Sequence, residues 1–400
     1  MGFLYIIIFI LTFFIGANIT DYYNISLTQF HFILIILWLI IFLHNSKFIL
    51  RNKYVILLLL FTFSFVLLKL FTDNSIGIYA FCDTILLAPI AATSLPIFNG
   101  KLNLKNIKIR RFLLLIIILS FLGDVVISII ERLTQTNFFE AMGTTNEYES
   151  EMYFRSHGIY GHPLYNSLIL SIGMSFILIS PFKNIIKFTL WTLGFIAILC
   201  FNTRSSMVLN LFFMALYLFR NILLKRGGFT KKMGIVVLAI FGGYVIYNLF
   251  IQYGFGGRMQ EYNYSFDDGS SQTRLLVFRI FDYIDTDTWL FGTDFNGYRM
   301  LKKSAHITVT ENYWIDWLLR LGIIFMIGYI LLFKKVLQQM YKRYKSFDKY
   351  FTLISFLFVS SMNNSLSINS IALVIFLLYI DIFNPNSISL IIPSKFIERR

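Results

Sequence analysis

The residues whose types and spacing could do chemistry are arginines and histidines placed where helices are predicted to begin. The segment "RSHGIYGHPLYN" (residues 155–166) enters an apolar stretch at a proline, which suits the first turn of a helix. It places Arg155, His157 and His162 beside a helix amino terminus, where the peptide dipoles favour anions, and Asn166 follows. The pattern predicts an anion-binding site, for example for a diphosphate. The alternative is a structured turn that only starts the helix.

Another arginine lies in a very short connection between two apolar stretches. The letters "FNTRSS" end one predicted helix (185–201) and lead into the next (206–220), so Arg204 has no separate soluble surface around it. This arginine either contributes to the same anionic site or snorkels, with its head group reaching the edge of the membrane.

A later segment, "SSQTRLLVFRIFDYI", predicts an amphipathic helix that carries Arg274 and Arg279. Positions five residues apart on an α-helix differ by about 140°, so the two arginines need not share a face. We favour Arg274 as the one that points into a site. Arg279 can equally pair with Asp282 or Asp285 on the surface.

The segment "ENYWIDWLLRLGI" opens a further apolar helix. Glu311 and Asn312 come just before it, Asp316 and Arg320 lie inside it, and His306 precedes Glu311 by five residues. An ionisable residue at membrane depth suggests a functional site. The spacing of four between Asp316 and Arg320 favours a plain salt bridge for that pair.

Several common kinds of site have no counterpart in the sequence. The ten-residue outer connection between the first two predicted helices (3–19 and 30–45) contains Asp21 as its only carboxylate, which argues against glycosyltransferases that hold a metal ion with paired acidic residues there. There is no Walker A motif for ATP, and the histidine spacings are not those of metal ligands. We therefore expect no metal and no cofactor.

The composition indicates a polytopic membrane protein. Of the 400 residues 57% are hydrophobic, and the mean hydropathy is +0.70. Apolar runs of about 18 or more residues recur, long enough to cross a bilayer as helices. The net charge of +14 is explained by basic residues gathered in cytoplasmic loops, so it does not indicate nucleic-acid binding. The N-terminal segment lacks the pattern of a cleaved signal peptide and is expected to remain as an anchor.

About twelve spans are predicted, with the N-terminus in the cytoplasm. They are 3–19, 30–45, 54–71, 76–98, 112–130, 164–180, 185–201, 206–220, 233–251, 312–333, 350–366 and 368–383. The resulting units are membrane helices (1–130), a first outer loop (131–163), central helices (164–251), a second outer loop (252–311), and C-terminal helices with a cytoplasmic tail (312–400). Arg155, Arg204 and Arg274 fall on the outer side, which normally holds few cations.

This ordered set of motifs resembles the O-antigen ligase and polymerase family, the Wzy-like membrane enzymes of surface polysaccharide assembly. The resemblance rests on "R..G...HP..N" (155–166), the "NTRSS" hairpin, "LFGTDFNGY" (290–298) and "ENYWIDWLLRLGI" (311–323), and it covers residues 110 to 335. It implies a GT-C-like all-α fold in the bacterial cytoplasmic membrane, with the active site on the extracytoplasmic side.

The resemblance also implies an activity. A polymerase of O-antigen, capsule or exopolysaccharide would move glycan from an undecaprenyl-diphosphate-linked donor to a lipid-linked repeat unit, with inversion and without metal. Arg155, Arg204 and Arg274 would hold the diphosphate and Glu311 would be the base. His157, His162, Asn166, Arg279, His306, Asn312 and Arg320 would line the substrate site. Expected partners are the bilayer and the flippase and chain-length regulator of the same pathway.

One position departs from the family pattern. Ligases of the family typically carry a histidine where this chain has Glu311, which favours a polymerase, and His306 could act as base in its place. The alternatives are a ligase that transfers finished glycan to another acceptor and a non-catalytic flippase or transporter of lipid-linked sugar. A flippase would have more charge near the middle of the membrane.

Overall fold

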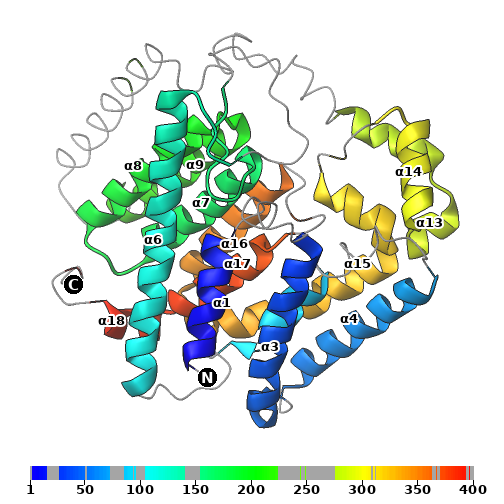
Figure 1. Cartoon of the computed structure of the whole chain (residues 1–400), viewed down its shortest axis with the longest axis horizontal. Coiled ribbons are helices and arrows are strands. Elements are labelled where there is room, and N and C mark those ends of the chain that lie inside the picture. The colour runs from blue at the N-terminus through cyan, green and yellow to red at the C-terminus, as the bar shows by residue number, and fades with distance from the viewer. Residues whose placement is uncertain are drawn as a thin grey trace.

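The computed structural model describes the chain at residues 2–15, 27–49, 52–72, 85–92, 94–95, 104–139, 154–223, 244, 248, 275–307, 310, 312–362, 366, 370–392 and 396. Within these ranges the regular secondary structure is helical and no strand occurs, which confirms the all-α class. Figure 1 shows the helices packed side by side, with α13 and α14 at one edge beyond the end of α15.

The longer helices are α1 (Gly2–Phe14), α3 (Leu27–Ile49), α4 (Lys53–Thr72), α6 (Leu104–Thr134), α7 (Pro163–Ile179), α8 (Asn184–Cys200), α9 (Arg204–Leu218), α15 (Tyr313–Met340), α16 (Ser346–Ser361) and α17 (Ala372–Ile382). The shorter ones are η3 (Phe219–Leu223), η4 (Val277–Tyr283), α13 (Thr286–Phe291), α14 (Phe295–Ser304), η5 (Tyr341–Arg343) and α18 (Pro385–Ile391).

Three of the described helices are long and apolar enough to cross a membrane: Lys53–Phe71, Ile107–Thr134 and Tyr313–Arg343. Five further apolar helices are shorter, and the predicted span 233–251 lies almost wholly outside the described residues. Large apolar side chains cover the outer face of α4. Exposure of these side chains to water would be unfavourable, whereas contact with lipid hydrocarbon would not be. They include Leu57, Leu60, Phe63, Leu67 and Phe71.

Helix α7 lies at the centre of the bundle and is buried along nearly its whole length between α8, α9, α16 and α17. Small polar residues connect it to α9: Ser167 Oγ lies 3.1 Å from Ser206 Oγ, and Asn210 Nδ2 donates to Ser171 Oγ at 2.7 Å. Hydrogen bonds between small side chains commonly join helices inside a membrane, because the hydrophobic effect does not drive helix association there.

Helix α6 (Leu104–Thr134) extends beyond the predicted span 112–130 at both ends. Arg110, predicted to lie in a cytoplasmic loop, is instead buried within α6 and pairs with Asp381 of α17 at 2.9 Å. A buried arginine needs such a partner. At the other end α6 runs to Thr134 and so includes Glu131 and Arg132, which the prediction had placed in the first outer loop.

Helix α15 is broken at Gly322, whose φ of 72° and ψ of 160° are not helical. The break frees the carbonyl of Leu319, which accepts a hydrogen bond from Thr293 N at 2.7 Å, just after α13. Gly292 and Gly322 both have positive φ, and a β-carbon on either would collide with the backbone of the other segment. Glycine is therefore required at both positions, and the connection after α13 is fastened to the break.

Candidate functional site

The segment 154–162 lies against α6, where two buried carboxylates hold its backbone. Glu131 Oε2 accepts from His157 N at 2.8 Å and from Gly158 N at 2.9 Å, while Oε1 accepts from Phe138 N at 3.0 Å. Asp124 Oδ1 accepts from Ile159 N at 2.9 Å. Asp124 and Glu131 are seven residues apart, which places them on one face of the helix two turns from each other.

The shape of this segment depends on two glycines and on Asn166. Gly158 and Gly161 have φ of 60° and 69°, as expected for a tight turn before a helix. Asn166 is fully buried; its amide nitrogen donates to the carbonyls of His157 and His162, and its Oδ1 accepts from Tyr160 N at 3.1 Å. The Asn166 side chain therefore holds the loop that carries the two histidines, and its contact with substrate stays a prediction.

The first residues of the segment meet the turn between α8 and α9. Arg155 Nε donates to Phe201 O at 3.2 Å, and Ser156 N donates to Cys200 O at 3.1 Å. Arg204 is the first residue of α9, three positions after Phe201. The structure thus brings together the two segments that carry Arg155 and Arg204, although about fifty residues separate them in the sequence.

The turn itself contains buried polar atoms without hydrogen-bond partners among the described residues. These atoms are the side-chain oxygen and nitrogen of Asn202 and the hydroxyl of Thr203, and both residues are 2% exposed. Thr203 occupies the N-cap position of α9 without making the usual cap bond, and Asn202 has a φ of 54°. Because buried polar groups are nearly always hydrogen-bonded, these atoms leave room for hydrogen bonds that a bound water or ligand would supply. The sequence indicated a role for Arg204 but none for Asn202 or Thr203.

Burial, together with nearby positive charge, lowers the pKa of His162. Burial, followed by the charges of Arg155 and His157, lowers the pKa of His162 from the ordinary 6.5 to about 4. His162 is therefore a neutral imidazole at neutral pH, and it precedes α7 without capping it through its side chain. His157 Nδ1 lies 2.9 Å from Phe139 O, so the ring of His157 is held by the backbone that follows α6.

The protonation of His162 gives a testable dependence of stability on pH. The unfolded chain takes up a proton near pH 6.5 and the folded chain only near pH 4. The contribution of the neutral imidazole to the free energy of unfolding is therefore present above pH 6.5. This contribution, about 1–3 kcal/mol, is lost as the pH falls from 6.5 towards 4. We expect His162→Gln to flatten this decline in the unfolding temperature of the detergent-solubilised protein. Parallel curves for the native protein and the variant would show that His162 titrates normally.

The predicted site residues in and before α15 form contacts away from the site at residues 154–162. Arg320 is buried; its Nε lies 3.4 Å from Asp316 Oδ1, as the spacing predicts, and its guanidinium lies 4.1 Å from the centre of the Tyr298 ring. Tyr298 Oη lies 2.9 Å from Thr310 Oγ1, which donates to Asp316 Oδ1 at 3.2 Å. This network joins α14 to the outer half of α15. It gives Arg320 a structural role, and the contact of Arg320 with substrate stays a prediction.

The remaining candidates are exposed, serve as caps or lie outside the described residues. Arg279 is exposed on η4, a 3-10 helix where an amphipathic α-helix was predicted, and His306 is exposed after α14. Asn312 caps α15 by accepting from Trp314 N at 2.9 Å. Arg274 and Glu311 lie outside the described residues. Among the residues that the structure describes, no group of three or more histidine, cysteine, aspartate or glutamate side chains could hold a metal ion.

Comparison with known proteins gives no family for this chain. No protein-family model matches it, and no curated protein sequence is significantly similar to it. The features of the chain that bear on function are the site formed by residues 154–162 and the α8–α9 turn, together with the order of its motifs.

Proposed function

We propose that the protein is a polysaccharide polymerase that uses an undecaprenyl-diphosphate-linked donor. The observation that carries the proposal is the junction of Arg155 with the turn that precedes Arg204, where Asn202 and Thr203 offer buried polar atoms. Arg155 beside the neutral imidazole of His162, and Arg204 at the start of the adjoining helix α9, suit a diphosphate, because guanidinium groups bind phosphate oxygens with two parallel hydrogen bonds.

In the proposed reaction, the hydroxyl of the acceptor sugar attacks the anomeric carbon of the donor glycan. A new glycosidic bond forms, the bond to the phosphate oxygen breaks, and undecaprenyl diphosphate leaves with the bonding electron pair. Arg155, Arg204 and Arg274 stabilise the charge that develops on the diphosphate. The proton of the hydroxyl goes to Glu311, the residue that the sequence assigns as the base, and single displacement inverts the anomeric configuration.

The proposal includes a setting for the enzyme. The helices would form about twelve spans in the bacterial cytoplasmic membrane, in a GT-C-like arrangement, with residues 131–163 and 252–311 outside. The long apolar helices and the lipid-facing side of α4 support a membrane location. Flippase and chain-length regulator would be partners in the same pathway, and the activated donor removes any need for ATP.

The decisive assay is incubation of the purified full-length protein with a synthetic lipid-linked repeat unit. We expect products with two or more repeat units on one lipid, detected by mass spectrometry, and an inverted linkage by NMR. Transfer only to an added lipid-core, wall or protein acceptor would identify a ligase. Movement of the lipid across vesicles without any new glycosidic bond would identify a flippase and contradict the proposal.

A further inference from the structure

The turn between α8 and α9 is held in place through its main chain. Phe201 O accepts from Arg155 Nε at 3.2 Å. Asn202 N donates to Leu199 O at 3.1 Å. The side chain of Asn202, by contrast, makes no hydrogen bond to the described part of the protein through either Oδ1 or Nδ2. A donor and an acceptor are thus held together at a fixed place in the turn.

The local backbone does not use the amide of Asn202. An asparagine in a left-handed turn usually bonds its side chain to a nearby backbone group, but Asn202, with a φ of 54° and 2% exposure, makes no such bond within the described residues. Glycine adopts the same backbone without burying polar atoms. A buried amide without a partner lowers stability, so the amide of Asn202 indicates a bound polar group.

The turn is partly exposed on the side where α9 begins. Arg155, Arg204 and Ser205 are half-buried there, next to the buried Asn202 and Thr203. Helix α9 has 15 residues, and the side chain of Thr203 at the N-cap position does not bond to its first N–H groups. Such a helix end favours an anion. Under the proposed function the anion is the diphosphate of the donor, and the group bonded to it is a sugar.

The amide of an asparagine side chain presents an acceptor and a donor side by side in one plane. Two neighbouring hydroxyl groups of a sugar ring match this pair, because one hydroxyl donates to Oδ1 while the other accepts from Nδ2. A deprotonated phosphate offers acceptors only, so it would leave Oδ1 without a donor. A hydrocarbon chain offers neither group. The chemistry of the turn therefore fits the sugar better than the other parts of a lipid-linked donor.

We propose that Asn202 binds a vicinal diol of the sugar that is bonded directly to the diphosphate, and that this contact selects the donor sugar. The inference rests on the proposed function, because the sugar reaches Asn202 only if its diphosphate lies at Arg155. Arg155 bonds to Phe201 O, one residue before Asn202, so the diphosphate and the sugar occupy consecutive positions along the turn. Asn202 acts in binding and supplies no group to the chemical step.

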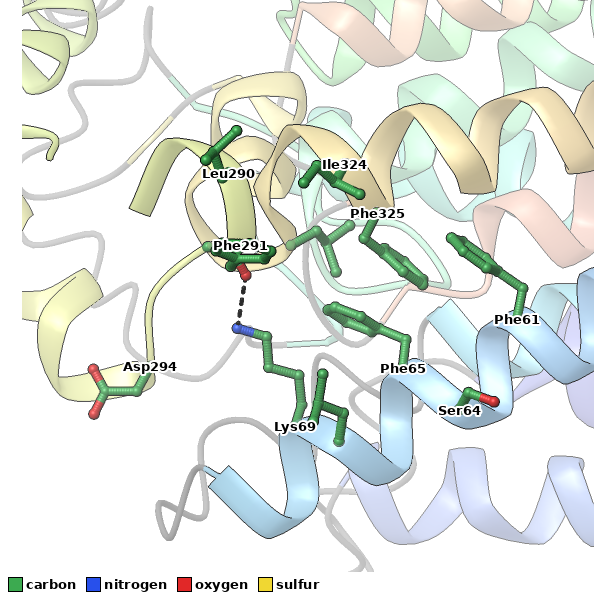
Figure 2. Close-up of a pocket in the computed structure, with 12 residues that line it drawn as sticks. Phe61, Ser64, Phe65, Lys69, Leu290, Phe291, Asp294, Ile324 and Phe325 are labelled. Carbon is green, nitrogen blue, oxygen red and sulfur yellow. Dashed lines mark hydrogen bonds between the residues drawn. The ribbon is translucent and has the colours of Figure 1, made fainter. Parts of the chain in front are cut away.

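The cavity of about 570 Å³ where α4, α13 and α15 meet fits a sugar less well (Figure 2). Its lining is mainly apolar, and the rings of Phe61 and Phe65 stack on Phe325. The carboxylate of Asp294 points away from the cavity in Figure 2 and caps α14 by accepting from Gly297 N at 2.7 Å. Sugar hydroxyls would lose hydrogen bonds to water in this cavity and gain few in return.

The test measures binding of lipid probes to the purified full-length protein by isothermal titration calorimetry. One probe is a short-chain polyprenyl diphosphate without sugar. The others are the same lipid carrying glucose, galactose or N-acetylglucosamine, each of which has a vicinal diol. We expect at least one glycosylated probe to bind about ten-fold more tightly than the sugar-free lipid, which corresponds to about 1.4 kcal/mol. Monodeoxy analogues that lack either hydroxyl of the diol should lose this advantage.

Asn202→Gly removes the amide and keeps the left-handed backbone. We expect this variant to bind the sugar-free lipid as the native protein does, and to bind the glycosylated lipid no more tightly. The deoxy analogues should then weaken binding no further, which is the signature of a direct pair between hydroxyl and amide. Gln135→Gly is the matched control, because Gln135 also has a positive φ, of 52°, but is exposed at the end of α6. This variant should keep the full preference for the sugar.

The outcomes separate this inference from the proposed function. If the native protein does not bind the sugar-free lipid, the diphosphate site is contradicted, and with it the proposed function. If the sugar-free lipid binds but none of the three sugars strengthens binding, the role of Asn202 is overturned while the diphosphate site stands. An equal gain from the sugar in the native protein and in Asn202→Gly overturns it as well.

Discussion

Replacing Arg155 or Arg204 with lysine is expected to slow glycan transfer by about 10²–10³ while the protein still inserts and folds, because each donor to a developing oxyanion typically contributes that much. Lysine keeps the charge but loses the planar pair of N–H groups that binds two phosphate oxygens at once. The rate would be measured with the synthetic lipid-linked repeat unit at saturating substrate. Arg274→Lys, in the part of the chain outside the described residues, is expected to behave in the same way.

Arg299→Lys is the matched control for these substitutions. Arg299 is exposed on α14 and lies 5.9 Å from the centre of the Phe295 ring, so the same chemical change there should leave the rate within two-fold of the native value, roughly the scale of a surface substitution. Full activity of Arg155→Lys, Arg204→Lys and Arg274→Lys together would falsify the assignment of these arginines to the diphosphate.

Replacing Glu131 with glutamine is expected to lower the free energy of unfolding by about 2–4 kcal/mol and to loosen residues 154–162, because hydrogen bonds to a charged group contribute about 1.5–3 kcal/mol each. The carboxylate accepts the backbone N–H groups of Phe138, His157 and Gly158 in the native protein. Glutamine keeps one oxygen and turns an NH₂ group towards the remaining donors. Hydrogen exchange would report the loosening at the amides of His157 and Gly158.

A substitution on the same helix provides the comparison. The Thr134 hydroxyl bonds only to neighbouring backbone and to Thr136 among the described contacts, so Thr134→Val should leave exchange at His157 and Gly158 unchanged. If Glu131→Gln also left these amides protected, the carboxylate would not be what holds the loop. The effect on glycan transfer should follow the loosening, since Arg155 belongs to the same segment.

Local sequence signals predicted the helices around the site closely. Helix α7 begins at Pro163, one residue from the predicted start, because a proline followed by a long apolar run specifies a helix start locally. The hairpin of α8 and α9 was also placed within two residues at each end, since the short polar letters "NTRSS" interrupt two apolar runs. Arg204 could therefore be recognised as an arginine confined to a turn.

The contacts that shape the site could not be predicted in this way, because they join residues far apart in the sequence. Asp124 and Glu131 share a face of α6, yet nothing in their spacing specifies the backbone of residues 157–159 as their partner. The same holds for Arg110, whose partner Asp381 lies on a helix 271 residues further along. Burial decides these pairings, and periodicity shows only which face of a helix is buried.

The break in α15 has a mechanical consequence. Its outer half, which begins at Tyr313, is bonded to the end of α13 through Leu319 and Thr293, while its inner half packs against α4. Because the helix is interrupted at Gly322 alone, a change in the backbone angles of this one residue would tilt the outer half relative to the inner half. A displacement of α13 would be transmitted to the start of α15, which follows Asn312 in the sequence, while the lipid-facing half of the helix keeps its place.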